Sequence, residues 1–157
     1  MSDLIYMKVE GESQGLISQN ASSPLSIGNK SQLAHEDECY VLNVNSLAIR
    51  SLATNTGHMS LSKLIDRATP LLSLALNNGE KLNIEISFYR HSGIQSCELY
   101  FKTIIKEAYV TQQNIIMGSN STESDHETLT LRYSQIRHNH TMANSHGYIL
   151  WSGDNTE

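Results

Sequence analysis

The feature that most constrains the fold is a strict alternation of apolar and polar residues from Leu82 to Phe88. Successive side chains of a strand point to opposite faces, so the apolar members of this run would all lie on one side. A helix needs apolar residues at every third or fourth position instead. The alternation therefore predicts a β-strand with one buried face and one wet face.

Other runs of strand-forming residues predict further strands, at residues 5–9, 14–17, 39–49, 96–105, 129–133 and 148–151. The alternation of apolar and polar residues shifts by one position at the adjacent pair Ile104 and Ile105, and Ala108 and Val110 continue the shifted pattern. We therefore expect a bulge or a new strand near Lys106. Residues 18–33 are polar and contain a proline, which predicts a long loop.

One segment breaks this β pattern and predicts a single short helix, from about Pro70 to Asn78. Thr69 suits the N-cap, Pro70 suits the first helical position, and Gly79 suits the left-handed residue that ends a helix. So short a helix needs a sheet to pack on. We expect that packing to use Leu71, Leu72, Leu74 or Ala75. The sequence thus indicates a mainly β barrel or sandwich with one covering helix.

The length of 157 residues fits one domain, and we expect an ordered core from about residue 4 to residue 151 with a short C-terminal tail. The net charge is −5 and the basic residues are scattered, which argues against nucleic-acid binding and against anionic membranes. No apolar run approaches membrane-spanning length, and the first residues lack the pattern of a signal peptide. We expect cytoplasmic synthesis and, if the protein leaves the cell, export without a cleaved signal.

The two cysteines, Cys39 and Cys97, lie far apart in the sequence, and neither has a second cysteine or a histidine at metal-ligand spacing. Both lie in strand-like surroundings. We expect two reduced, buried thiols that react slowly, rather than a disulfide or a zinc site.

The seven histidines are the first place to look for chemistry. The run of His138, Asn139 and His140, with His146 close by, spells the letters of a nuclease motif but has no acidic partner nearby. We interpret it as a polar turn before the last strand. The acidic runs at residues 35–38 and 123–127 lack the spacing of a calcium loop and indicate a solvated surface.

No nucleophile elbow, phosphate loop or dinucleotide-binding motif occurs in the chain. Neither cysteine has a recognisable catalytic context. We therefore predict no catalytic residue, no bound cofactor and no metal, and hence a protein that is not an enzyme.

Several runs, taken in order over nearly the whole chain, resemble the haemolysin-coregulated protein (Hcp) family. They are residues 5–11 with 14–15, residues 26–30, residues 63–72 leading to Gly79, and residues 86–90, 131–136 and 147–151. The sequence departs from the usual pattern at Thr69, where the family has serine, and at His146, which interrupts a Ser-Gly-Tyr run. Only six residues follow Trp151, which leaves no room for an appended toxin domain.

The resemblance implies a small β-barrel of two packed antiparallel sheets with the helix at about Pro70 to Asn78. It also implies a structural component of the bacterial type VI secretion system, in which hexameric rings stack into an exported tube. The partners it implies are further copies of the chain, the sheath, the spike and small effector proteins that the tube carries or chaperones.

Edge strands give an independent reason to expect assembly. A small β-domain with bare edges risks open-ended aggregation, and pairing each edge with a neighbour in a closed ring removes that risk. Growth would then continue only along the ring axis. Our candidate for a ring-stacking loop is the polar segment Ser51, Leu52, Ala53, Thr54, Asn55, Thr56 and Gly57.

The alternative to a tube subunit is a non-catalytic β-barrel module that binds a sugar or a peptide. A metal-dependent nuclease built on His138, His140 and His146 is the remote third hypothesis.

Overall fold

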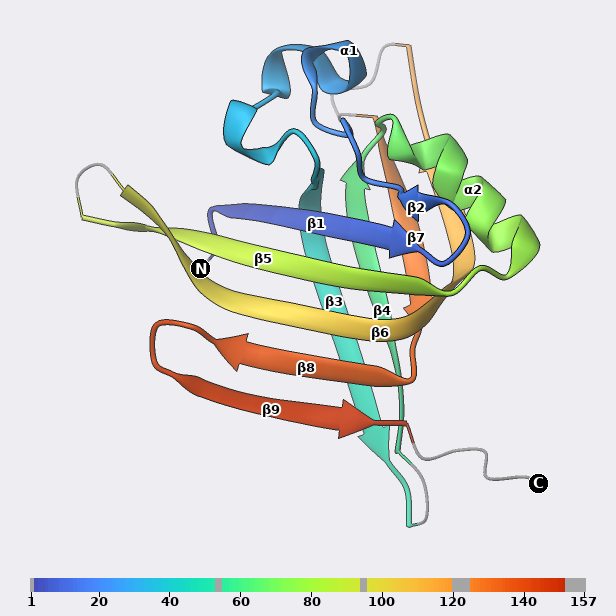
Figure 1. Ribbon diagram of the computed structural model, residues 1–157, viewed down its shortest axis with the longest axis vertical. Helices are drawn as coiled ribbons and strands as arrows, with labels where there is room; N and C mark the ends of the chain where they lie inside the picture. The colour runs from blue at the N-terminus through green and yellow to red at the C-terminus, as the bar shows by residue number, and fades with distance from the viewer. Residues whose placement is uncertain (1, 53–54, 94–95, 120–124, 152–157) are drawn as a thin grey trace.

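The computed structural model describes residues 2–52, 55–93, 96–119 and 125–151, and more than half of these residues belong to β-strands (Figure 1). The strands are β1 Leu4–Gly11, β2 Gly15–Leu16, β3 Cys39–Arg50, β4 Asn55–Leu64, β5 Leu82–Ser92, β6 Ser96–Ile116, β7 His126–Arg132, β8 Gln135–His140 and β9 Ser145–Leu150. The helical segments are α1 Pro24–Ile27, α2 Ala68–Asn78 and the short 3₁₀ turns η1 Gly28–Lys30 and η2 Leu33–His35.

Six of these strands close on themselves as an antiparallel barrel. The pairs run β1 to β3, β3 to β4, β4 to β7, β7 to β6, β6 to β5 and β5 back to β1. The β8–β9 hairpin extends the sheet beyond the barrel through β6. The predicted mainly β barrel of two packed sheets is therefore confirmed.

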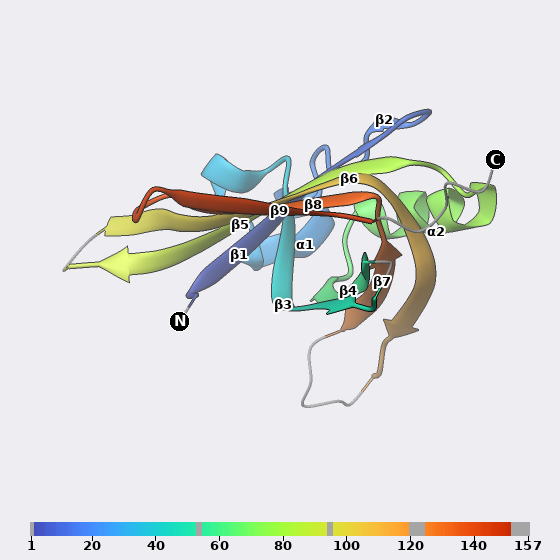
Figure 2. The same ribbon diagram turned by 90° about the horizontal axis from the view of Figure 1, so that it is seen from below.

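Strand β6 belongs to both sheets because it bends near its middle. Its first part pairs with β5 and β8, and its second part pairs with β7. At the bend, two residues of β6 oppose one residue of β5, and Glu107 has a left-handed φ of 52°. Figure 2 shows the strand curving from one sheet to the other. The predicted irregularity near Lys106 is thus a β-bulge that turns a barrel corner.

Apolar side chains from both sheets fill the barrel. The alternation first noted in β5 places Leu82, Ile84 and Ile86 in this core, as predicted. Residues of the other strands meet them there, including Met7, Val9, Leu61, Ile105, Leu129, Leu131 and Ile136. The interior is therefore a packed hydrophobic core.

Helix α2 begins at Ala68, so two details of its prediction are wrong. Thr69 lies inside the helix and is buried, and Asp66 Oδ1 instead accepts the N–H of Ala68 at 2.9 Å. Pro70 is tolerated in the third position because the first four N–H groups of a helix lack partners within it. Gly79 ends the helix at φ 59°, as predicted. Leu72 and Ala75 are buried against the barrel, whereas Leu74 is 46% exposed and does not pack there.

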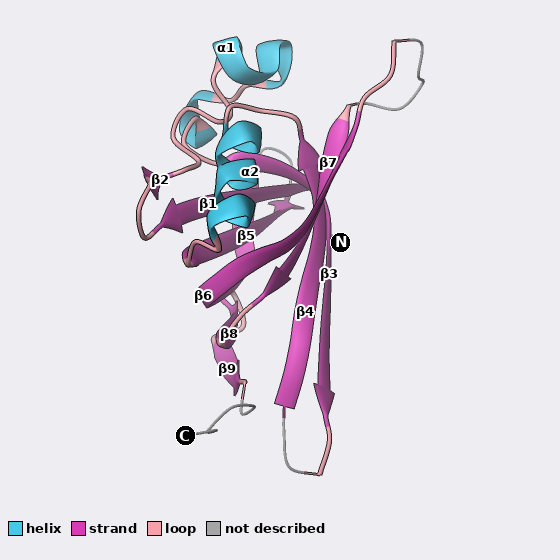
Figure 3. Cartoon of the chain, turned by 90° about the vertical axis from the view of Figure 1, so that its right-hand side faces the viewer, coloured by secondary structure: helices cyan, strands magenta, loops and turns pink. Residues whose placement is uncertain are grey.

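The expectation of a single helix and of one long loop at residues 18–33 is also wrong. The helical turns α1, η1 and η2 occupy part of that segment. Pro24 starts α1 because its ring already holds φ near the helical value. These turns lie at the end of the molecule opposite the free end of the β3–β4 hairpin (Figures 1 and 3).

Candidate functional site

The feature best placed for interaction is the β3–β4 hairpin, which projects well beyond the barrel (Figure 3). Its inner half is anchored, because Met59 to Leu64 of β4 pair with β7. In its outer half each strand pairs only with the other. Leu47 and Ile49 are 43% and 53% exposed there. An isolated two-stranded hairpin is only marginally stable in water, so this ribbon gains stability from any partner that covers it.

The outer edge of β3 is open over most of its length. Only Cys39 and Tyr40 pair with β1, and the rest of the strand pairs with β4 alone. Residues 41–49 include no proline and no charged side chain, which are the usual devices that block pairing with another chain.

The second open edge belongs to β9, which pairs with β8 and ends the described sheet order. This strand also lacks proline, lysine and arginine. Tyr148 and Leu150 expose 62% and 50% of their surface. Two open, weakly charged edges on one small domain are templates for pairing with further chains.

The two open elements meet at one end of the molecule. Asn55 Nδ2 at the start of β4 donates to the carbonyl oxygen of Leu150 at 3.5 Å, the long limit of a hydrogen bond. The end of β9 is also held to the barrel, because the Arg132 guanidinium lies 4.5 Å from the ring centre of Trp151. The start of β4 and the end of β9 are therefore in contact.

The predicted stacking segment lies at the tip of this hairpin, and only part of it is loop. Ser51 and Leu52 follow β3 and are exposed. Ala53 and Thr54 lie outside the described residues. Asn55 to Gly57 belong to β4, so the loop is shorter than predicted. The sequence prediction missed this because Asn, Thr and Gly are poor indicators of a strand.

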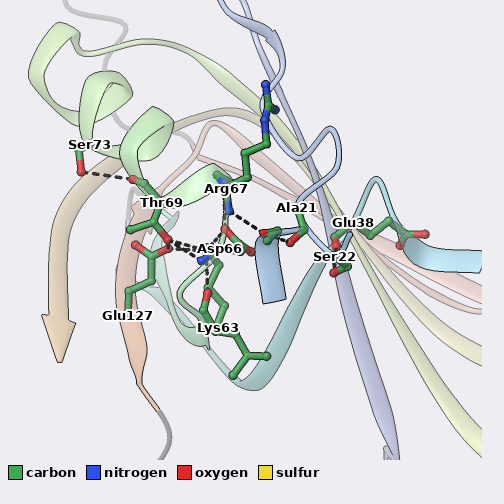
Figure 4. Close-up of polar contacts among 12 residues, drawn as sticks. Ala21, Ser22, Glu38, Lys63, Asp66, Arg67, Thr69, Ser73 and Glu127 are labelled. Carbon is green, nitrogen blue, oxygen red and sulfur yellow. Dashed lines mark hydrogen bonds and ion pairs between the residues drawn. The ribbon is translucent and has the colours of Figure 1, made fainter. Parts of the chain in front are cut away.

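A second constellation lies inside the protein, between β4, α2 and β7 (Figure 4). Lys63 is fully buried, and its ammonium contacts carboxylate oxygens of Asp66, at 2.8 Å, and of Glu127. The same ammonium donates to the Leu64 carbonyl at 3.0 Å. The Thr69 hydroxyl accepts from the N–H of Asp66 at 3.1 Å and donates to Glu127 at 2.7 Å. Gln113 of β6 donates to the other oxygen of Glu127 at 2.8 Å.

The charges of this cluster do not balance, since one ammonium faces two carboxyl groups in a dry environment. Burial raises the pKa of Asp66, and Lys63 opposes that shift. Burial also raises the pKa of the nearby Cys39 thiol well above its usual range. The network ties the start of α2 to the barrel wall, and we interpret it as structural rather than catalytic because all of its charged members are buried.

The role of this cluster was missed at the sequence level. The segment from Lys63 to Leu72 carried the strongest resemblance, but nothing in it indicates that Lys63 is buried. The sequence held one indication of this burial. Met59, Leu61 and Lys63 are spaced two apart and therefore share one face of β4, so Lys63 lies in line with two apolar residues.

The histidine run lies in a strand, so its interpretation as a polar turn is wrong. His138 and His140 are in β8 opposite Thr103 and Phe101. Burial lowers the pKa of His138, and its Nδ1 atom lies 3.0 Å from the Thr103 hydroxyl. Both rings pack against Phe101. Over the described residues, no group of three or more His, Cys, Asp or Glu side chains is arranged to hold a metal.

The cysteine prediction is half right. Both cysteines are free, and Cys39 is buried as expected. Cys97 is exposed, close to the β5–β6 turn, so the expectation of a buried thiol there is wrong. Within the described chain, no helix has the length and apolar character needed to span a bilayer.

Comparison with known proteins identifies the relatives of this architecture. Residues 6–140 match the protein family described as "Type VI secretion system effector, Hcp". The "Major exported protein" of Pseudomonas aeruginosa is 29% identical over 166 residues, which cover 96% of each chain. The "Uncharacterized protein YhhZ" of Escherichia coli K12 is 32% identical over 146 residues, and the match spans 92% of this chain but only 37% of that protein.

Solved structures share the fold over nearly the whole chain. A structure titled "Crystal structure of Hcp protein" has a TM-score of 0.89 and 27% identity, and the match covers 96% of this chain and all of the other. "Secreted protein Hcp3 from Pseudomonas aeruginosa" has a TM-score of 0.85 and 30% identity, with 94% of this chain and 99% of the other covered.

Proposed function

The chain belongs to the Hcp family of type VI secretion system proteins, and from that premise we propose that it is a non-catalytic tube subunit. Six copies close into a ring, and rings stack into a tube that is exported. The observation that carries this proposal is the pair of open edges on β3 and β9.

Ring closure is supported by the position of these edges. They lie on different strands, so one chain can present β9 to the β3 edge of a neighbour in a head-to-tail contact. Such contacts repeat by rotation and leave no edge free once the ring closes. The number six comes from the family and not from the edges.

Stacking is assigned to the tip of the β3–β4 hairpin. The hairpin projects from one end of the molecule (Figure 1), so it can reach beyond its own ring. Its exposed Leu47, Ile49 and Leu52 side chains offer apolar surface to the next ring. This proposal retains the predicted segment, residues 51–57, as the stacking element.

Export and partners follow from the same assignment. Two relatives carry names that describe them as exported or secreted. We propose that this chain is made in the cytoplasm, leaves without a cleaved signal peptide, and works with a sheath, a spike and small effectors. Nucleic acid and the membrane interior have no part in this role.

The alternative, a barrel that binds a sugar or a peptide, has less support. Barrels that hold ligands keep a cavity within the strands, whereas here the interior is filled by the hydrophobic core.

Electron microscopy of the purified protein separates the two hypotheses. We expect six-fold rings with an open lumen, and end-to-end stacks of rings at high concentration. Single compact particles without a lumen, at every concentration at which the protein stays folded, would contradict the tube and favour the binding module.

A further inference from the structure

A polar hollow of about 410 Å³ lies on the β8–β9 hairpin, whose outer backbone edge the proposed ring uses. It is lined by Arg137, Asn139, His140, Thr141, Asn144, Ser145 and His146. The hollow is a wide-open depression on the protein surface.

The strand register brings three of these side chains to one face. Asn139 pairs with His146 across the hairpin, and Arg137 lies two residues from Asn139 on the same strand. Residues two apart on a strand share a face, as do cross-strand partners. Ile136 and His138 point to the opposite, core side. The guanidinium, the amide and the imidazole therefore face the same solvent-exposed hollow.

The lining is rich in hydrogen-bond donors. The Arg137 guanidinium offers donors only, in a planar fork that matches an oxyanion. Asn139 and Asn144 can each donate through a side-chain amide.

Among the described residues, no acidic side chain forms an ion pair with the side chains that line the hollow. The chain has a net charge of −5, yet no aspartate or glutamate occurs between Glu127 and Asp154. Among the ion pairs of the described residues, none includes Arg137. On the same face, Lys102 lies opposite Asn139, and Glu85 already pairs with this lysine.

We propose that this hollow is a binding site for a small oxyanion, namely phosphate or a phosphate monoester. Arg137 grips two oxygens of the anion, and Asn139 and His146 donate to the others. The site uses side chains on a sheet face, whereas the proposed ring contact uses the backbone edge of β9.

Phosphorus NMR of inorganic phosphate tests this proposal on the intact protein, in whatever assembly it forms. The phosphate line should broaden on adding protein and saturate at one site per chain, in sodium chloride of fixed ionic strength. Arg137→Gln should weaken binding about tenfold, the loss expected for a charge-assisted hydrogen bond. Arg137→Lys should weaken binding less, because it keeps the charge and loses the fork.

Arg67→Gln is the matched control, since it removes the same charge from an exposed position at the start of α2, away from the hollow and from the proposed ring contacts. It should bind phosphate as the wild type does, and light scattering should give each variant the wild-type mass. No saturable broadening in the wild type, or an equal loss in Arg67→Gln and Arg137→Gln, would overturn the proposal. Tube assembly would be unaffected by either result.

Discussion

Gly57 in β4 lies against the hydroxyl of Tyr133, so closely that a Cβ atom added at Gly57 would be 2.7 Å from it. The same Cβ would be 2.6 Å from the carbonyl oxygen of Leu47 on β3. Tyr133 is buried just after β7, and Gly57 lies in the projecting part of the hairpin, close to Met59, where the pairing of β4 with β7 begins. This contact joins the stacking element to the barrel.

Gly57→Ala should therefore destabilise the protein by about 1–3 kcal/mol, because the clash involves backbone as well as a side chain. Urea unfolding measures the loss. Gly147→Ala in β9 is the control, since a Cβ there meets nothing within 4 Å. Equal stability of the two variants would mean that the contact between Gly57 and Tyr133 leaves room for a methyl group.

Lys63→Met should cost about 3–5 kcal/mol, because it leaves the carboxyl groups of Asp66 and Glu127 buried without their cation. Lys102→Met is the control, because the Lys102–Glu85 pair is partly exposed and should contribute no more than about 1 kcal/mol. Comparable losses for both variants would show that the Lys63 cluster is open to solvent.

Asp66 predicts a pH dependence with a definite sign. Burial raises the pKa of its carboxyl in the folded chain, so folding favours the protonated form. The stability that this group contributes is complete below its unfolded pKa, about 4, and is lost as pH rises through its folded pKa. The unfolding free energies of the wild type and of Asp66→Asn can be measured from pH 4 upwards. The value for the wild type minus the value for the variant should decrease as pH rises. An increase would mean that the attraction of Lys63 outweighs the effect of burial on the Asp66 carboxyl.

Lysine on the open β3 edge should block assembly without unfolding the chain. We expect the double variant Leu47→Lys and Ile49→Lys to keep its circular dichroism spectrum and to lose higher assemblies, because both side chains are exposed and each ring contact would have to accommodate two added positive charges. Leu74→Lys on α2 introduces lysine at a similarly exposed site and should assemble normally. Assembly of the β3 variant at wild-type concentration would exclude this hairpin from the interface.

The sequence supported the fold well, because alternation in β5 and the phase change near Lys106 are local patterns that the barrel preserves. It failed where tertiary contacts decide. Thr69 is buried by Glu127 from a distant strand, and Leu74 faces water because α2 covers the barrel with Leu72 and Ala75. Cys97 and His138 share strand-like surroundings, yet one is exposed and one packs on Phe101. The open edges of β3 and β9 depend on strand order, which no local pattern reveals.

Light scattering of the purified chain on dilution tests the central claim, ring assembly, most directly. Six copies of the 17.5 kDa chain give a mass of about 105 kDa. We predict that mass at micromolar concentration, with little change on dilution, because closing the ring satisfies every open edge at once. A folded monomer of 17.5 kDa throughout that range would contradict the account.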